Sequence, residues 1–553
     1  MYSAALKIIR SGFALACAAI AVAPLVQAQS YTAVYSYGTH TGDPRSPVPN
    51  GLMAQGRDGK LYSTTSLGGA TSGGAAFNIT TTGSLTKLLD FASNEGAVGG
   101  LTLGSDGKFY GTTSGGGTSN VGTVFKLTST GTRTTLWNFT SFDDGANPIV
   151  APLLGKDGNF YGVNPDNRSG DYGLVYKITT GGTLTVRGDF NFTNGSAPNL
   201  PVQGTDGNFY GNARFGGSSS SCSGCGVVYK MTSGGTITVL HNFDGYPTDG
   251  SQPVGVLVQA NDGNLYGTTY VGGANNQGTV YKITTSGTYT LLYSFHDVGG
   301  SDGINPWTGL ASGTDGNLYG TAQGGTHRSG VLFKITPSGT ESVLYNFCSV
   351  SGCADGFFPQ TPILQHTNGK FYGSVESGGA NGLNGGVFYS LDMGLQPFAG
   401  LVTWQGAISK TVEILGQGFT GATKVSFNGT KASFTVVSDT YLTATVPAGA
   451  TKGFVTVTTP TATLTSNRKF FVLPTITSFS PDSGPVGTVV TITGNNLTGA
   501  TKVKFGGVKA TSFTVNSDTQ ITATVPTAAA TGTIQVTTSG GTATSATAFT
   551  VTP

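Results

Sequence analysis

The chain has 553 residues, of which 88 are glycine, 10% are charged and 37% are hydrophobic. Its length exceeds that of one ordinary domain, and its patterned apolar residues exclude a disordered chain. A net charge of +2, without any cluster of lysine and arginine, excludes a nucleic-acid-binding surface of the electrostatic kind. Low charge with abundant glycine, threonine and aromatic residues is typical of a β-rich extracellular protein.

The first 28 residues have the pattern of an export signal. Lys7 and Arg10 supply the basic region, residues 13–26 supply the apolar stretch, and Val26-Gln27-Ala28 matches a small-residue cleavage site. We therefore expect the mature chain to begin near Gln29.

An uncleaved anchor and a lipoprotein signal are the alternatives at the N-terminus. The apolar stretch is short for a membrane span and contains Pro24. Cys17 invites lipidation, but Ala14 stands where a lipoprotein signal normally has leucine. No later segment is apolar enough to cross a bilayer, so we expect no transmembrane segment after cleavage.

Four cysteines remain in the mature chain, and they form two close pairs in Gly/Ser-rich segments. The pairs are Cys222 with Cys225 and Cys348 with Cys353. In an oxidising compartment two local disulfides are expected. The alternative, a zinc site built from both pairs, is disfavoured because no histidine accompanies either pair.

One phrase recurs seven times, at intervals of about 50 residues, which is the length of a propeller-type or kelch-type unit. The copies are Asp58-Gly-Lys-Leu-Tyr62, Asp106-Gly-Lys-Phe-Tyr110, Asp157-Gly-Asn-Phe-Tyr161, Asp206-Gly-Asn-Phe-Tyr210, Asp262-Gly-Asn-Leu-Tyr266, Asp315-Gly-Asn-Leu-Tyr319 and Asn368-Gly-Lys-Phe-Tyr372.

The sequence of each unit predicts four strands bounded by glycine-rich turns. In the fifth unit the strands are expected over 255–259, 264–269, 279–283 and 289–295. Seven such units predict a seven-bladed β-propeller. A parallel β-helix is the alternative, but it would have a shorter and stricter period.

The seventh unit lacks its own fourth strand after residues 387–391, while the mature N-terminus supplies one. Tyr31-Thr-Ala-Val-Tyr-Ser-Tyr37 matches the fourth strand Tyr289-Thr-Leu-Leu-Tyr-Ser-Phe295. We expect the N-terminal strand to complete the last blade, which would remove open sheet edges.

The repeat unit resembles the GloVer-type tandem repeat of exported bacterial proteins. The resemblance rests on the combination of DGN[LF]YGTT, a Gly-Gly loop, GTV[FY]KIT and an [LV]Y[SN]F ending, as in Leu344-Tyr-Asn-Phe347. The resemblance covers about residues 31–393 and implies an extracytoplasmic location. The repeat is also distantly similar to the propellers of streptogramin-type lyases, which implies an enzyme as an alternative.

After Gly394 the pattern changes to alternating threonine and valine, and two copies of about 78 residues follow. The shared phrases are Thr420-Gly-Ala-Thr-Lys-Val425 with Thr498-Gly-Ala-Thr-Lys-Val503, and Thr443-Ala-Thr-Val-Pro447 with Thr522-Ala-Thr-Val-Pro526. They resemble Ig-like IPT/TIG modules. The first copy departs at its start, where Thr403 and Ala407 replace Pro481 and Pro485, so its first strand is expected to dock differently against the propeller.

Positions that vary among the seven repeat units are not constrained by core packing. One such position lies just before each Gly-rich loop. The fourth residue after each tyrosine is Ser66, Ser114, Pro165, Arg214, Tyr270, Gln323 or Glu376. In a propeller these positions lie on one face, around the channel. We predict that Arg214, Tyr270, Gln323 and Glu376 form a ligand-binding rim; solvent-exposed loop variation without a ligand is the alternative.

The repeated Asp-Gly pairs raise a calcium alternative. Calcium needs several oxygen ligands at one point, whereas these aspartates lie on separate hairpins. Turn formation is therefore the expected role of both Asp-Gly sets, including Asp144-Gly145, Asp249-Gly250, Asp302-Gly303 and Asp355-Gly356. No metal or cofactor is expected.

Catalytic patterns are sparse. The five histidines (His40, His241, His296, His327 and His366) form no nucleophile motif and no metal-spaced pair. His327 and Glu376 are weak candidates for a general acid/base pair, because they belong to adjacent blades. Asp166 is the other acid expected near the rim, but it lies several blades from Glu376 and so cannot complete a glycosidase pair.

These observations predict an all-β protein with four segments: a signal peptide over 1–28, a seven-bladed β-propeller over 29–396, and Ig-like β-sandwiches over 397–473 and 474–553. The predicted function is a secreted or cell-surface binding or adhesion-type protein. Its propeller loop face would contact an extracellular glycan or a surface protein, and the sandwiches would act as spacer or contact units. A lyase or hydrolase acting on polysaccharide or lactone, and a structural envelope or matrix component, are the alternatives.

Overall fold

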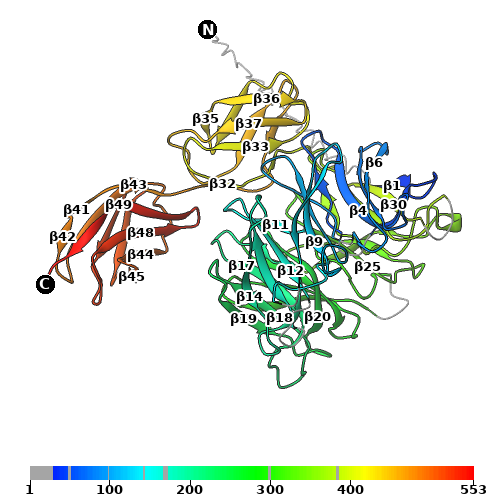
Figure 1. Cartoon of the computed structure of the whole chain (residues 1–553), viewed down its shortest axis with the longest axis horizontal. Coiled ribbons are helices and arrows are strands. Elements are labelled where there is room, and N and C mark those ends of the chain that lie inside the picture. The colour runs from blue at the N-terminus through cyan, green and yellow to red at the C-terminus, as the bar shows by residue number, and fades with distance from the viewer. Residues whose placement is uncertain are drawn as a thin grey trace, which may run out of the picture.

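The computed structural model describes residues 29–47, 51–97, 99–140, 143–165, 172–296, 301–380 and 385–553. Within these ranges the regular structure consists of β-strands and one 3-10 turn, η1 (Ser351–Cys353). The all-β architecture predicted from the sequence, a propeller followed by two Ig-like sandwiches, is confirmed (Figure 1).

Seven antiparallel sheets follow one another through the described part of the propeller. We number them 1 to 7 in chain order. Sheet 1 contains β2 (Pro44–Pro47), β3 (Ala54–Gln55), β4 (Leu61–Gly68), β5 (Ala75–Ile79) and β6 (Leu85–Asp90). Sheet 2 contains β7 (Thr102–Leu103), β8 (Phe109–Thr113), β9 (Thr123–Leu127) and β10 (Arg133–Asn138). Sheet 3 contains β11 (Leu153–Leu154), β12 (Phe160–Asn164), β13 (Leu174–Ile178) and β14 (Leu184–Asp189). Sheet 4 contains β15 (Ser196–Pro198), β16 (Val202–Gln203), β17 (Phe209–Phe215), β18 (Val227–Met231) and β19 (Ile237–Asn242).

The remaining propeller sheets complete the ring. Sheet 5 contains β20 (Gly250–Gln259), β21 (Leu265–Gly272), β22 (Thr279–Ile283) and β23 (Tyr289–Ser294). Sheet 6 contains β24 (Ala311–Ser312), β25 (Leu318–Ala322), β26 (Val331–Ile335) and β27 (Glu341–Asn346). Sheet 7 contains β28 (Leu364–Gln365), β29 (Phe371–Val375), β30 (Val387–Asp392) and, as its outer strand, the N-terminal β1 (Ser30–Ser36). The pairing of β1 with β30 joins the two ends of the propeller segment.

The repeated Asp-Gly phrase has a packing function at each hairpin. In the six copies with aspartate the tyrosine hydroxyl donates to that aspartate, as Tyr266 does to Asp262 at 2.6 Å, while Oδ1 of the same aspartate accepts the backbone N–H two residues on. In the seventh copy the Asn368 amide donates to the Tyr372 hydroxyl at 2.9 Å. In four copies the tyrosine ring packs on the phenylalanine of the next sheet, stacked in the first two of the pairs below and tilted in the last two. These pairs are Tyr62–Phe109, Tyr110–Phe160, Tyr161–Phe209 and Tyr319–Phe371. The aspartates are thus bound to the hairpin and its tyrosine, which agrees with their expected turn role.

A glutamine at the end of the inner strand connects neighbouring sheets in four places. Its Oε1 accepts the backbone N–H of the residue that precedes the Asp/Asn-Gly phrase in the previous sheet. The pairs are Lys156–Gln203, Thr205–Gln259, Thr314–Gln365 and Thr367–Gln55. The last pair joins sheet 7 to sheet 1, so hydrogen bonds at the inner strands also close the ring.

The connections of each sheet alternate between two faces, because successive strands are antiparallel. We call the side with the Asp-Gly turns, which join the inner strand to the second, the hairpin face. The loops between the second and third strands, and the connections between sheets, lie on the opposite side, which we call the loop face.

The first sandwich has its hydrophobic core between two sheets and a short parallel pair. One sheet contains β31 (Gly400–Leu401), β33 (Thr411–Leu415), β37 (Tyr441–Thr445) and β36 (Phe434–Ser438). The other contains β35 (Thr430–Ala432), β34 (Lys424–Phe427), β38 (Val455–Thr458) and β39 (Thr463–Thr465), and the parallel pair is β32 (Gln405–Gly406) with β40 (Phe471–Val472).

The second sandwich repeats this plan around its own core. One sheet contains β41 (Thr475–Ser480), β43 (Val489–Asn495), β47 (Gln520–Thr524) and β46 (Phe513–Ser517). The other contains β42 (Ser483–Gly484), β49 (Gly541–Val551), β48 (Gly532–Thr538), β44 (Lys502–Phe505) and β45 (Val508–Lys509). Its first long strand, β41, has six residues, whereas the corresponding β31 has two, so the two copies differ at the start as their sequences do.

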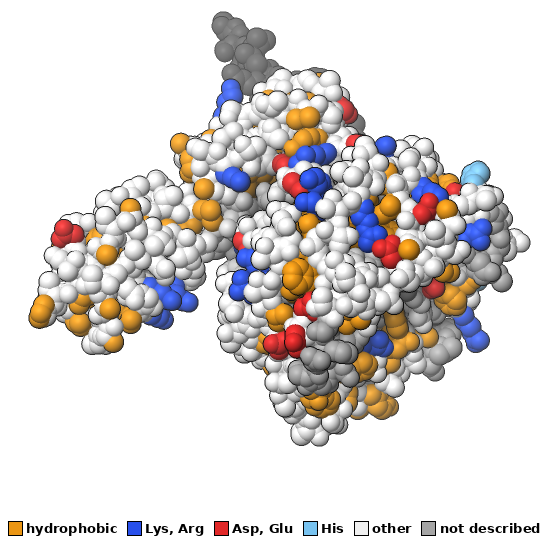
Figure 2. Space-filling view, in the orientation of Figure 1, with side chains coloured by type: hydrophobic (Ala, Val, Ile, Leu, Met, Phe, Trp, Pro, Cys, Tyr) orange, Lys and Arg blue, Asp and Glu red, His pale blue; other side chains and the backbone are white. Residues whose placement is uncertain are grey.

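The first sandwich packs on the hairpin face of the propeller. The Thr440 hydroxyl donates to the Arg57 carbonyl of sheet 1 at 2.7 Å, and Asn261 of sheet 5 donates to the Asn467 carbonyl at 3.4 Å. Lys156 of sheet 3 lies 4.2 Å from the Trp404 ring centroid. In Figure 2 basic and acidic side chains gather where this sandwich meets the propeller. Its partners come from sheets 1, 3 and 5, so the first sandwich covers part of the hairpin face and leaves the loop face uncovered.

Candidate binding surface on the loop face

Large hydrophobic side chains are exposed on the loop face. Among the described propeller residues, the large hydrophobic side chains with the highest exposed fractions all lie in loop-face segments. They are Leu67, Ile149, Phe192, Phe215, Tyr246, Val350 and Phe358, with exposed fractions between 38% (Ile149) and 62% (Tyr246). Single exposed apolar residues are ordinary, but their restriction to one face marks that face as a candidate contact surface.

Two predicted rim residues, Arg214 and Tyr270, come together on this face. Arg214 is the penultimate residue of β17 in sheet 4, and Tyr270 lies in β21 of sheet 5. The Arg214 guanidinium lies 5.7 Å from the Tyr270 ring centroid and 5.3 Å from that of Phe215. The two neighbouring repeats therefore present a cation and two aromatic rings side by side.

Trp307, which the sequence reasoning missed, completes the group. Its ring lies 5.3 Å from the Arg214 guanidinium and packs edge-on to Tyr270 at 5.0 Å. Trp307 immediately follows the Pro306 that opens the sixth unit, and no other unit has tryptophan there. That irregularity in the repeat is the signal that could have found it. We call Arg214, Phe215, Tyr270 and Trp307 the arginine–aromatic cluster.

Gln252 holds the Arg214 guanidinium from the side of sheet 5. Its Oε1 accepts from Nη2 of Arg214 at 3.1 Å. Gln252 has a φ of +54° and precedes Pro253, a backbone conformation that is unfavourable for a residue before proline. The backbone N–H of Gln252 donates to the Cys225 carbonyl of sheet 4 at 2.8 Å, which offsets part of that cost and fixes the side chain at the seam between the sheets.

The other predicted rim residues are placed around the same face but not in this cluster. Gln323 and Glu376 are half-buried. The Gln323 carbonyl accepts from the Ile304 N–H at 2.7 Å, and the Glu376 N–H donates to the Phe358 carbonyl at 3.1 Å. Burial raises the pKa of the Glu376 carboxyl. Within the described ranges no hydrogen bond or ring contact joins either side chain to Arg214.

The equivalent positions in the first units contribute small side chains. The Ser66 and Ser114 hydroxyls donate to the carbonyls of Ser46 and Gly96, so both are engaged by backbone. Pro165 ends the described part of its loop, and Asp166 lies outside the described residues. The cluster is therefore a property of sheets 4 to 6.

His327, the weak catalytic candidate, is exposed in its loop, where the Ser329 hydroxyl donates to its carbonyl at 3.1 Å. Between the His327 and Glu376 side chains, both of which are described, there is no hydrogen bond or ion pair. The acid/base pair remains a prediction without a supporting contact.

Both predicted disulfides, Cys222–Cys225 and Cys348–Cys353, are present. They close loops of sheets 4 and 6 on the loop face. In the part of the chain that the structure describes, no three histidine, cysteine, aspartate or glutamate side chains are grouped so that they could hold a metal ion.

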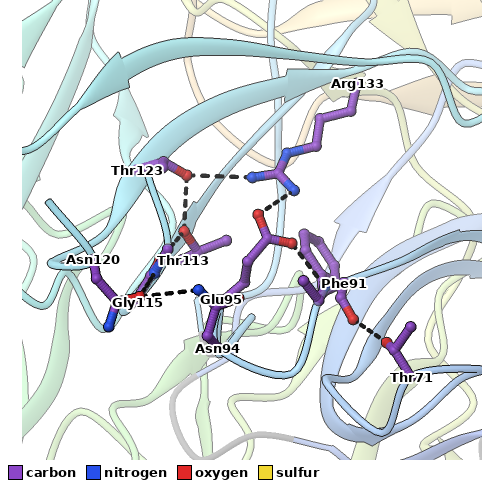
Figure 3. Close-up of polar contacts among 11 residues, drawn as sticks. Thr71, Phe91, Asn94, Glu95, Thr113, Gly115, Asn120, Thr123 and Arg133 are labelled. Atoms are coloured by element: carbon purple, nitrogen blue, oxygen red, sulfur yellow. Dashed lines mark hydrogen bonds and ion pairs between the residues drawn. The ribbon is translucent and has the colours of Figure 1, made fainter. Parts of the chain in front are cut away.

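A second arginine, Arg133, has a different electrostatic setting (Figure 3). Its guanidinium lies 5.3 Å and 4.9 Å from the rings of Phe91 and Phe125, and Nη1 forms a 2.7 Å ion pair with Oε1 of Glu95. The other Glu95 oxygen accepts the Ala92 N–H at 2.8 Å. Arg133 thus has an internal counter-charge, and its role is to join sheets 1 and 2.

A cavity of about 210 Å³ lies at the junction of the propeller with both sandwiches. It is lined by Lys156 and Asp157 of sheet 3, Asp206 of sheet 4, Gln405 of the first sandwich and Ser539 of the second, among others. Burial lowers the pKa of Lys156 to about 8. The cavity shows that the β48–β49 turn of the second sandwich reaches the hairpin face.

Family models match most of the chain. The Gloeobacter/Verrucomicrobia repeat matches residues 23–151 and 149–389, and the IPT/TIG domain matches residues 399–472 and 474–551. The chain belongs to the Gloeobacter/Verrucomicrobia repeat family and carries two IPT/TIG domains. No curated protein matches its sequence.

Solved structures show only distant likeness. A fungal alcohol oxidase of the AA5 family, in complex with copper, is 13% identical, with 92% of this chain and 98% of the other covered at a TM-score of 0.36. SGBP-B from a xyloglucan utilization locus of Bacteroides uniformis is 23% identical over 28% of this chain and 48% of the other, at 0.15. The surface glycan-binding protein PbSGBP-B of Prevotella bryantii is 20% identical over 26% and 38%, at 0.20. Scores this low define no common fold.

Within the described ranges there is no helix with the length and hydrophobicity that a bilayer crossing requires.

Proposed function

We propose that this protein is a secreted or cell-surface binding protein whose propeller contacts an extracellular glycan through the loop face. The observation that carries the proposal is the one-sided distribution of exposed large hydrophobic side chains on the described propeller. Aromatic side chains with a few placed polar groups are the usual composition of a small-molecule or sugar site. The arginine–aromatic cluster has that composition.

The arrangement of the domains supports the same orientation. The first sandwich occupies the hairpin face, so a ligand approaching the propeller has access to the loop face. The two IPT/TIG domains then serve as a spacer between this face and the point where the protein is held. The predicted signal peptide and the two disulfides favour an oxidising, extracytoplasmic location.

The test is a glycan array, followed by polysaccharide pull-down, with the mature chain from residue 29 to 553. It is run beside a variant with alanine at Arg214, Tyr270, Gln323 and Glu376. The matched control replaces Lys431 and Lys509, which are exposed on the sandwiches, with alanine. Glycan binding that the rim variant loses and the control retains supports the proposal. Retention by the rim variant would place the ligand elsewhere, and absence of glycan binding by the parent would reject the proposal.

A further inference from the structure

Among the described residues, Arg214 is a partly desolvated cation without a counter-charge. Nη2 donates to Gln252, and among the described residues this is its only hydrogen bond. No carboxylate of the described chain forms an ion pair with it. Burial lowers the pKa of the guanidinium, and Tyr270 opposes this effect. A partly buried cation of this kind is stabilised most by a charge-assisted hydrogen bond to an anionic group of a ligand.

The contrast with Arg133 separates this setting from ordinary packing. Both guanidinium groups lie over aromatic rings on the same propeller. Arg133 is neutralised by Glu95 at 2.7 Å and is only 17% exposed, whereas Arg214 has a neutral amide as its partner. In the part of the chain that the structure describes, no acidic side chain forms an ion pair with Arg214.

The surrounding groups favour a sugar over an extended peptide. Peptide recognition commonly adds main-chain hydrogen bonds at a free strand edge. Here the nearby backbone is already paired: the Gly217 N–H donates to the Phe192 carbonyl at 2.7 Å, and the Gln252 N–H donates to Cys225. Recognition is left to side chains. Phe215, which is 40% exposed, offers an apolar ring face against which the C–H face of a sugar can pack.

We infer that the arginine–aromatic cluster binds a uronic acid unit of an acidic polysaccharide, with the sugar carboxylate at Arg214 and the sugar ring against Phe215, Tyr270 or Trp307. Planar guanidinium is well suited to a carboxylate because it can donate two parallel hydrogen bonds. Gln252 holds Nη2 of the guanidinium through its hydrogen bond. The inference rests on the proposed glycan-binding function and specifies its ligand class.

The experiment compares glycans that differ only in charge. Calorimetric titration of the mature chain uses oligogalacturonate, its methyl ester, and a neutral β-glucan oligomer of equal length. Oligogalacturonate is expected to bind roughly tenfold or more tightly than its methyl ester, because esterification removes the carboxylate. Arg214→Gln is expected to remove that preference. The matched control is Arg328→Gln, which removes the same charge from an exposed loop-face position.

The outcomes separate the two proposals. Equal affinity for the acid and its ester, or an unchanged preference in Arg214→Gln, overturns the uronate inference while glycan binding stands. Binding of no oligomer overturns the uronate inference, and the glycan array then decides the proposed function separately. An equal loss in Arg328→Gln indicates general attraction of anions and also overturns the inference. The comparison of acid with ester uses the unmodified protein, so it holds even if a variant folds poorly.

Discussion

The Nη2 atom of Arg57 lies 2.6 Å from Oε1 of Glu413, and this ion pair joins the first hairpin of the propeller to β33 of the first sandwich. Nε of Arg57 donates to the second carboxylate oxygen at 3.2 Å, so the pair is bidentate. Arg57 also lies 4.9 Å from the Tyr441 ring centroid. The pair therefore contributes to holding the sandwich on the hairpin face.

Replacement of Arg57 by glutamine is expected to lower the free energy of unfolding at pH 7 by about 1–3 kcal/mol, because the partly buried Glu413 carboxylate loses its counter-charge. Burial already raises the pKa of Glu413, and Arg57 opposes this effect. In the variant the folded-state pKa rises further above the unfolded one. The loss of stability in the variant is therefore absent below the pKa that Glu413 has in the unfolded chain, and it is complete above the pKa that Glu413 has in the folded protein.

The measurement is urea unfolding of R57Q, E413Q and the double variant at pH 4 and pH 7. We expect a coupling energy of about 1 kcal/mol or more at pH 7 and a smaller one at pH 4. A coupling near zero at pH 7 would show that the sandwich is held by its other contacts.

Glu341, the first residue of β27, is a second partly buried carboxyl whose pKa is shifted. Oε1 of Glu341 is buried and has no hydrogen-bond partner among the described residues. Burial, followed by the charge of Asp302, raises its pKa from 4.5 to about 7, while His296 opposes the rise. Folding therefore favours the protonated form. The cost to stability is absent below about pH 4.5 and complete above about pH 7.

Glu341→Gln is expected to stabilise the protein at pH 8 by about 1 kcal/mol, a value reduced for partial solvent exposure, and to change little at pH 4. Thermal unfolding across this pH range checks the prediction. Glu95→Gln serves as the comparison, because it removes an acid that is paired with Arg133 and should destabilise instead. A pH profile of Glu341→Gln parallel to that of the parent would contradict the assignment.

Lys156 is expected to titrate near pH 8 rather than 10.5, because burial disfavours its ammonium form. Its Nζ lies 4.2 Å from the Trp404 centroid, so loss of the charge should alter the emission of that indole. Fluorescence titration of the parent, with W404F subtracted, should give a midpoint near pH 8 that K156M lacks. A midpoint above pH 10 would mean that the ammonium is well solvated.

Tyr31→Ala tests the joint between the chain ends. The Tyr31 ring stacks on Tyr345 at 3.8 Å, and its hydroxyl donates to the Asp355 carbonyl at 2.6 Å. Loss of these contacts should lower the free energy of unfolding by about 2–4 kcal/mol. Tyr246→Ala, at a tyrosine that is 62% exposed, should change it by less than about 0.5 kcal/mol. Equal effects in urea unfolding would show that β1 contributes little to ring stability.

The repeated phrases determined much of the fold by themselves. Asp-Gly hairpins, alternating strands and the aromatic of each phrase act over a few residues or between adjacent copies, so their pattern is visible along the chain. For the same reason the two C-terminal copies were identified as IPT/TIG modules from short shared phrases. Arg214 and Tyr270 of the proposed rim were predictable from the sequence, because both stand at a variable position of a regular frame.

Only the tertiary structure decided how these pieces combine. Trp307 joins Arg214 because the ring places the start of one sheet beside the end of a strand two sheets earlier, a relation that no local pattern encodes. Gln252 reaches Arg214 through a left-handed φ of +54° before a proline, which sequence rules would disfavour. The docking of the first sandwich through Arg57 and Glu413 depends on a pair 356 residues apart in the chain. Contacts between such distant residues depend on the assembled surfaces, and these surfaces determine which propeller face remains open.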